Sequence, residues 1–92
     1  MSQCLRISFA MDVTKNFLSS FVQKHARSLH LEGTVQTESD NIVKVIVCGK
    51  KESLEEFVDL LHKRAAKEEV ENIEIEPFIS GKDFRGVFRV IE

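Results

Sequence analysis

The strongest limit on the fold comes from the way the spacing of apolar residues changes along the chain. In residues 5–11 every second residue is apolar, which is the spacing of a strand with one buried face. From about residue 16 to residue 29 the apolar residues instead recur every three or four positions, as on the buried side of a helix. A strand and an amphipathic helix are therefore predicted in this order, the helix burying Phe17, Leu18, Phe21, Val22, Ala26 and Leu29.

Two further strands are expected after this helix. Gly33 is expected to close the connection from the helix, and strands are predicted at 34–37 and 42–48. The turn between them, ESDN, contains Asp40 and Asn41, which tolerate the left-handed backbone that a hairpin requires. The pattern is typical of a β-hairpin.

A second helix is predicted to begin at Ser53 and to end near residue 67. Ser53 and Glu56 have the spacing of a capping box, in which a serine and a glutamate satisfy each other's backbone N–H groups. The side chains at helical spacing after Ser53 are mostly apolar. The helix is therefore expected to bury Leu54, Phe57, Val58, Leu61 and Ala65.

The C-terminal part of the chain alternates again. Residues 72–79 have strand spacing, but Pro77 has no N–H to donate, which indicates an edge strand. A short final strand is predicted to place Phe84, Gly86, Phe88 and Val90 on one face. The order β-α-β-β-α-β with a short last strand predicts an α+β fold, the ferredoxin-like split βαβ sandwich, with two helices on one face of an antiparallel sheet.

Composition and charge narrow the function. The chain has 92 residues, enough for one domain spanning 1–92, and its 42% hydrophobic content is that of a packed domain. A net charge of −2 argues against nucleic acid or a membrane surface as a partner, because binding to either relies on a basic face. Because no apolar run approaches the roughly 20 residues of a membrane span and no signal-peptide pattern is present, the expected location is cytoplasmic.

Residues 26–49 resemble the middle of the acylphosphatase family. In that family a helix ending in Ala and a small apolar pair is followed by Gly, a strand, a hairpin, a Val-rich strand and a closing Gly. The spacing of Ala26, Leu31, Gly33, Val43 and Gly49 follows that order, and the second helix and the ending FRV continue it. The resemblance implies a small enzyme that hydrolyses the carboxyl-phosphate bond of acyl phosphates without a metal or cofactor.

The resemblance also implies where the chemistry would take place. A glycine-containing phosphate cradle would follow the first strand and end in a helix-borne Arg, and an Asn after the second strand would position the attacking water. Counting from Gly33, Ser19 occupies the position of the Arg and Thr37 that of the Asn. The cradle reads DVTKNFL and keeps only Val13, without either glycine. We therefore expect a domain that has lost the hydrolysis and acts as a small binding or regulatory module.

Two other functions stay open from the sequence. One is an active acylphosphatase with non-standard site residues. The other is a structural interaction protein that uses a sheet edge or the open sheet face. Residues 67–76, KEEVENIEIE, form an acidic stretch, which is either the solvent-exposed start of a strand or a docking site for a basic partner. The sequence does not identify a protein partner.

The loop after the first strand is the candidate anion site. Lys15 could replace the lost positive charge, and the N–H groups of Asn16, Phe17 and Leu18 could face a phosphate or another small anion. In the alternative reading, Thr14 or Asn16 caps the helix while Phe17 and Leu18 enter the core. If the loop is an anion site, Thr14 is also expected to belong to it.

Neither a metal site nor an RNA-binding surface is expected. His25, His30 and His62 are scattered, without the i, i+4 spacing of a helical metal pair. The segment RGVFRV faintly resembles the aromatic strand of RNA-recognition domains, but it lacks alternating exposed aromatics on which bases could stack. Phe84 and Phe88 are instead expected in the core.

Cys4 and Cys48 are the only cysteines. In the split βαβ arrangement the first strand pairs antiparallel with the third, so the start of one lies beside the end of the other. Cys4 begins the first strand and Cys48 ends the third, which predicts that they are neighbours able to form a disulfide. The alternative is a pair of reduced thiols packed as small hydrophobes, which a cytoplasmic location favours.

Overall fold

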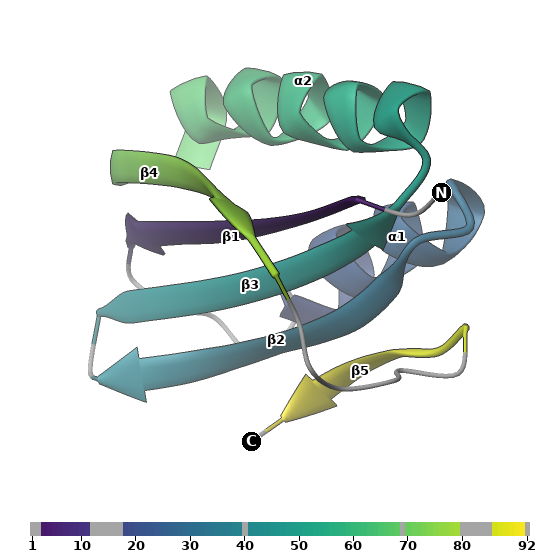
Figure 1. The fold of residues 1–92 in the computed structure, drawn as a ribbon. Coiled ribbons are helices and arrows are strands. Elements are labelled where there is room, and N and C mark those ends of the chain that lie inside the picture. Colours follow the sequence, from purple (N-terminus) through teal and green to yellow (C-terminus); the bar gives the residue numbers. More distant parts are fainter. Residues whose placement is uncertain (1–2, 12–17, 40, 69, 80–85, 92) are drawn as a thin grey trace.

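The computed structural model describes residues 3–11, 18–39, 41–68, 70–79 and 86–91. Five strands and two helical stretches follow one another along the chain (Figure 1). In chain order they are β1 (Gln3–Ala10), η1 (Leu18–Gln23), α1 (Lys24–Ser28), β2 (Glu32–Ser39), β3 (Ile42–Gly49), α2 (Lys51–Glu68), β4 (Glu71–Phe78) and β5 (Phe88–Ile91).

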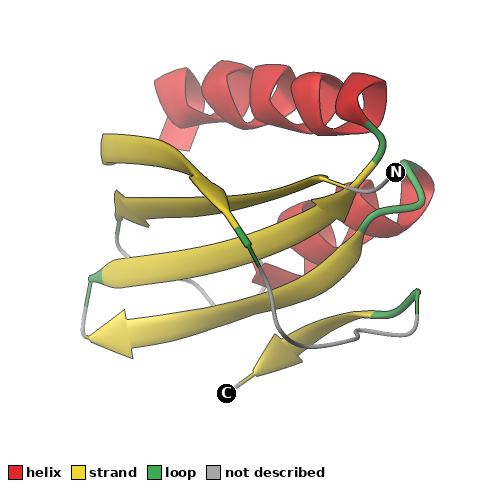
Figure 2. Ribbon diagram, viewed as in Figure 1, coloured by secondary structure: helices red, strands yellow, loops and turns green. Residues whose placement is uncertain are grey.

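The strands form one sheet in the order β4-β1-β3-β2-β5. The pairs β1–β3, β1–β4 and β2–β3 are antiparallel. In Figure 2 the helices, in red, lie behind and above the sheet, and the face toward the viewer carries none. The predicted α+β ferredoxin-like fold is confirmed, and so is the edge position of β4, the strand that contains Pro77.

The expectation of a wholly antiparallel sheet is wrong for the last strand. β5 pairs with β2 in parallel, with Gly33 beside Phe88 and Val35 beside Val90. β4 and β2 point in opposite directions, and the chain reverses between β4 and β5 on its way to the opposite edge. β5 therefore arrives alongside β2 pointing the same way, and the sheet is mixed.

The first predicted helix is present, but it does not wind as one α-helix. Its first six described residues form the π-helix η1, and the five residues of α1 follow. The predicted burial of Phe21, Val22 and Ala26 is confirmed. The proposed caps, Thr14 and Asn16, lie outside the described residues. A π-helix has more residues per turn than an α-helix, but η1 has only six residues, which is too short for apolar spacing to distinguish the two.

The end of α1 is closed by a backbone motif centred on His30. The N–H of Leu31 donates to the carbonyl of Ala26 at 2.8 Å, and the N–H of His30 donates to the carbonyl of Arg27 at 3.1 Å. His30 has a φ of 58°, so it takes the left-handed position that glycine usually fills in this arrangement. The chain turns here and enters β2.

Gly33 lies inside β2, so its predicted place in the connection before that strand is wrong. Its φ is +140°, and a Cβ built on it would lie 1.8 Å from the carbonyl oxygen of Ile46 in β3. Its N–H donates to the carbonyl of Val87 at 3.0 Å. The missing side chain therefore allows the backbones of β2 and β3 to approach closely.

The helix α2 begins at Lys51, so Ser53 lies within it and is not the predicted N-cap. The N–H of Leu54 donates to the carbonyl of Lys50 at 3.0 Å, which places the first helical bond before Ser53. Lys51 and Glu52 are good helix formers, and the helix extends through them. The predicted buried face is confirmed for Leu54, Phe57 and Leu61, with Val58 half-buried.

The core lies between the sheet and the helices. It contains the buried side chains of Ile7, Phe9, Met11, Phe21, Val22, Ala26, Leu31, Val35, Val43, Val45, Val47, Leu54, Phe57, Leu61 and Phe88. No helix within the described ranges is long and apolar enough to cross a membrane. The alternating residues of β1 and β3 supply one side of this core, and the helices supply the other.

Candidate functional site

The candidate site lies where β1 and β2 end, at the left of Figure 1. The backbone ties these strand ends together, because the N–H of Met11 donates to the carbonyl of Asn41 at 2.9 Å in the turn between β2 and β3. In the sheet register Ala10 lies beside Ile42, and Thr37 lies beside Val43. The end of β1 and the end of β2 therefore flank the start of β3.

Thr37 is exposed near the C-terminal end of β2. It lies on the same face of the strand as Val35, which is fully buried beneath the helices. Since η1 contacts β2, Thr37 stands on the helix-bearing side of the sheet, at the margin of the core. The hydroxyl of a threonine can donate and accept a hydrogen bond, but it carries no amide.

Ser19 is the second residue of η1. Leu18, the last residue of the predicted anion site, begins this helical stretch. The other predicted anion-binding residues, Thr14, Lys15, Asn16 and Phe17, lie outside the described residues. The anion site therefore stays a prediction.

Gln23 fixes the far end of η1 to the opposite edge of the sheet. Its Nε2 donates to the carbonyl of Phe88 in β5 at 3.3 Å, and η1 contacts both β5 and β2. No local sequence pattern singles out Gln23, because its partner lies 65 residues further along the chain. The helical stretch that carries Ser19 is therefore held against both β2 and β5.

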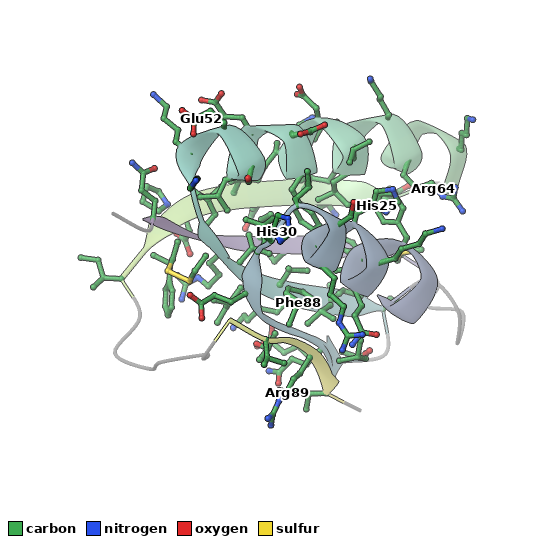
Figure 3. All side chains as sticks on the ribbon, turned by 90° about the vertical axis from the view of Figure 1, so that its right-hand side faces the viewer. His25, His30, Glu52, Arg64, Phe88 and Arg89 are labelled. Carbon is green, nitrogen blue, oxygen red and sulfur yellow. A yellow bond between two sulfur atoms is a disulfide. The ribbon has the colours of Figure 1, made fainter. Side chains whose placement is uncertain are left out.

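A guanidinium also approaches η1, and it comes from α2. The Cζ of Arg64 lies 5.5 Å from the centre of the Phe21 ring. The ring of His25 lies 4.5 Å from the Phe21 ring, and Figure 3 shows Arg64 and His25 close together between the two helices. His25 Nδ1 lies 2.8 Å from the carbonyl oxygen of Phe21, so this nitrogen carries the proton and donates. No periodic pattern in the sequence indicated this cluster.

The three histidines occupy separate places. His25 is engaged with Phe21, His30 closes α1, and His62 is exposed on α2. Within the part of the chain that the structure describes, no group of three or more His, Cys, Asp or Glu residues could hold a metal ion.

The two cysteines are direct cross-strand neighbours. Cys4 in β1 pairs in register with Cys48 in β3, which confirms the predicted proximity. Their Cα atoms lie 4.0 Å apart, and the sulfurs are joined in a disulfide, the yellow bond in Figure 3. Cys48 is buried although its side chain points away from the helices. The disulfide links β1 to the central strand β3 on the open face of the sheet.

Arg6 lies on the same open face and is directed toward β4. Its guanidinium donates to Glu76 and stands over the ring of Phe78, 5.6 Å from the ring centre. This cation is therefore engaged at the β1–β4 boundary, on the face opposite Thr37.

Comparison with known proteins gives the family. The acylphosphatase family matches residues 13–89, from before η1 into β5. A curated protein named Acylphosphatase from Methanococcoides burtonii is 36% identical over 72 residues, which cover 78% of this chain and 75% of that protein. Another of that name, from Caldivirga maquilingensis, is 31% identical over 68 residues, covering 73% of this chain and 72% of that protein.

A solved structure agrees with these sequence comparisons. The structure of an acylphosphatase from Coxiella burnetii superposes with a TM-score of 0.82 at 26% identity, covering 98% of this chain and 93% of that one. Its likeness extends over β1, which the family match does not include. The chain belongs to the acylphosphatase family.

Proposed function

We propose that this chain is an acylphosphatase-family domain in which hydrolysis of acyl phosphates is absent or very slow, and that it serves as a small binding or regulatory module. The observation that carries the proposal is the pair Ser19 and Thr37, which stand where the family resemblance requires an Arg and an Asn.

The physical argument rests on what these side chains can do. An arginine offers a permanently charged fork of N–H donors to phosphate oxygens, and a serine hydroxyl offers one neutral donor. An asparagine offers a carbonyl and an amide to a water molecule, and a threonine at the exposed end of β2 offers only its hydroxyl. Because losing one such donor typically lowers an enzyme's rate by ~10²–10³, losing both is expected to remove most of the activity.

An active acylphosphatase is the second candidate, and two observations favour it. The curated relatives at 31% and 36% identity both carry the name Acylphosphatase. In addition, the guanidinium of Arg64 approaches η1 through the Phe21 ring, so a cation from α2 is near the helical stretch that holds Ser19. In this reading Arg64 supplies the charge that position 19 lacks.

Turnover of a small acyl phosphate, such as acetyl phosphate, separates the two candidates. The first predicts a rate indistinguishable from spontaneous hydrolysis. A rate near that of typical enzymes, roughly 10 per second, would overturn it. Arg64→Met then tests the second candidate, because it should abolish such activity, whereas Lys63→Met, on the exposed part of the same helix, should leave it unchanged.

A further inference from the structure

A pocket of about 300 Å³ lies between the start of β1 and the first half of α2, away from the strand ends that hold Thr37. Its apolar lining consists of Leu5, Leu54 and Val58, of which Leu54 is buried and the other two are half-buried. Its polar lining consists of Gln3, Lys51, Glu55 and Asp59, all of them exposed, with Glu55 and Asp59 one turn apart on α2. The pocket therefore has an apolar interior, and two carboxylates and one ammonium group lie at its margin.

The apolar surface continues from this pocket onto β4. Pro77 lies beside Leu5 in the sheet register, and Ile75 lies beside Ile7, so both face the helix-bearing side of the sheet. Ile7 is fully buried, whereas Ile75 is 37% exposed and Pro77 is exposed. The helices thus cover β1 but leave β4 exposed at Ile75 and Pro77, whereas Ile73 packs against the core. We name this surface, formed by Leu5, Leu54, Val58, Ile75 and Pro77, the α2–β4 groove.

The part of α2 that borders the groove carries more negative than positive charge. Residues 51–59 of α2 contain four carboxylates, at Glu52, Glu55, Glu56 and Asp59, against one lysine. Among the residues that the structure describes, none of these four forms an ion pair; the ion pairs found are Arg6 with Glu76 and Lys44 with Glu38. The two carboxylates that line the pocket, Glu55 and Asp59, favour a ligand that combines apolar and positively charged groups.

Further carboxylates of β4 lie on the opposite, open face of the sheet. Glu71, Glu74 and Glu76 lie beside Ala10, Ser8 and Arg6 in the sheet register, and Glu76 is paired with Arg6 there. β4 is also an edge strand, so part of its backbone N–H and C=O groups face away from β1 and can pair with an added strand. Pro77 removes one donor from that edge.

We propose that the α2–β4 groove binds an extended, lysine- or arginine-rich segment of a partner protein, which places one apolar side chain in the pocket and its cations beside Glu55 and Asp59. An extended chain satisfies the three features together: it can pair with the β4 edge, fill an apolar pocket with alternate side chains, and supply repeated positive charges. A second copy of this chain fits poorly, because its own β4 would bring carboxylates against carboxylates.

This inference does not depend on the proposed loss of hydrolysis. The groove lies between β1, α2 and β4, whereas Ser19 and Thr37 lie on η1 and at the end of β2. An active or an inactive domain could therefore bind such a segment, and the binding experiment does not use acyl phosphate.

The test is a titration of the full ¹⁵N-labelled chain with a short blocked peptide in which lysines alternate with leucines, followed by amide shifts. We expect saturable shifts at Leu5, Leu54 and Val58 and along β4, with affinity that falls as salt is added. The same peptide with glutamates for lysines should not bind, and one with serines for leucines should bind at least about tenfold more weakly.

Two matched double variants test which carboxylates of α2 contribute to peptide binding. Glu55→Lys with Asp59→Lys should weaken binding about tenfold or more, because both residues line the pocket. Glu52→Lys with Glu56→Lys makes the same change of charge on the same helix outside the pocket lining, and should weaken binding much less. Circular dichroism checks that both variants fold.

Several outcomes would overturn the proposal. They are no shifts up to about 1 mM peptide, equal binding of the acidic peptide, equal losses for the two variant pairs, and shifts confined to other surfaces. Shifts that grow with protein concentration without peptide would show that a second copy occupies the groove, which also contradicts the proposal.

Discussion

Arg64 in α2 and Phe21 in η1, which are 43 positions apart, join the two helical stretches by a contact of a cation with an aromatic face: the Cζ of Arg64 lies 5.5 Å from the ring centre. Phe21 is 5% exposed and packs in the core, so the ring presents a fixed surface to the guanidinium. The contact connects α2 to the helical stretch that carries Ser19.

This contact predicts a measurable coupling energy. A double-mutant cycle of Arg64→Met and Phe21→Leu, measured by urea unfolding, should give a coupling of about 0.5–1 kcal/mol, the usual range for a cation over an aromatic ring. The cycle is needed because Phe21→Leu also changes core packing. Pairing Lys63→Met with Phe21→Leu should show no coupling, and an equal coupling there would contradict a specific role for Arg64.

Ser19→Arg combined with Thr37→Asn is predicted to create or raise acyl-phosphate hydrolysis, because it restores the charge and the amide that the family chemistry requires. The single variants should gain less than the double variant, since the two groups act on one transition state. Turnover of acetyl phosphate by all three proteins is the measurement. If none gains activity, the two missing cradle glycines become the main deficit.

Lys15→Ala is predicted to abolish any phosphate-induced amide shifts at the start of η1. Lys15 is the only cation in the loop sequence DVTKNFL, while Asp12 in the same loop repels anions. A phosphate titration of the ¹⁵N-labelled wild type and variant tests this. Lys24→Ala is the matched control at the start of α1, and shifts that survive Lys15→Ala would place the anion site elsewhere.

Gly33→Ala is predicted to be strongly destabilising. The new Cβ would lie 1.8 Å from the Ile46 carbonyl oxygen, and the residue would keep a φ of +140°. We expect a loss of at least about 2–3 kcal/mol in the free energy of unfolding. Gly86→Ala is the control: Gly86 also has a positive φ, +72°, but its Cβ would meet nothing within 4 Å, so its cost should be about 1–2 kcal/mol. Equal losses would show that backbone conformation alone matters.

Reduction of the Cys4–Cys48 disulfide is predicted to lower the free energy of unfolding by ~3–4 kcal/mol, because the bond closes a loop with a sequence separation of 44. Unfolding with and without reductant measures the effect. Cys4→Ser with Cys48→Ser should be insensitive to reductant. No difference for the wild type would mean that the purified protein holds reduced thiols, as the predicted cytoplasmic location favours.

Much of the fold could be predicted because its signals are local. The alternation in β1 and the helical spacing of Leu54, Phe57 and Leu61 each depend on one segment, and the order of segments leaves few topologies. The Cys4–Cys48 neighbourhood followed from that topology. The start of α2 was predicted less well, because apolar spacing does not show where a helix begins. The capping-box spacing of Ser53 and Glu56 indicated a start at Ser53, whereas the helix begins at Lys51.

The parts that could not be predicted depend on contacts between distant segments. The parallel pairing of β5 with β2, the bond from Gln23 to Phe88 and the approach of Arg64 to Phe21 all join residues more than forty positions apart. At the candidate site, the sequence indicated Ser19 and Thr37 only through the family resemblance. It gave no sign of the cation from α2 or of the anchoring by Gln23.

The pairing of β5 with β2 has a consequence for biosynthesis. Until residues 88–91 have left the ribosome, the outer edge of β2 has no partner, even if β1, β2, β3 and both helices are already assembled. The nascent chain therefore passes through a stage in which a strand edge and the site of Phe88 in the core stay open to solvent and to other chains. The pairing of β5 with residues 33–36 of β2 covers this part of the strand edge, and Phe88 then fills its place in the core.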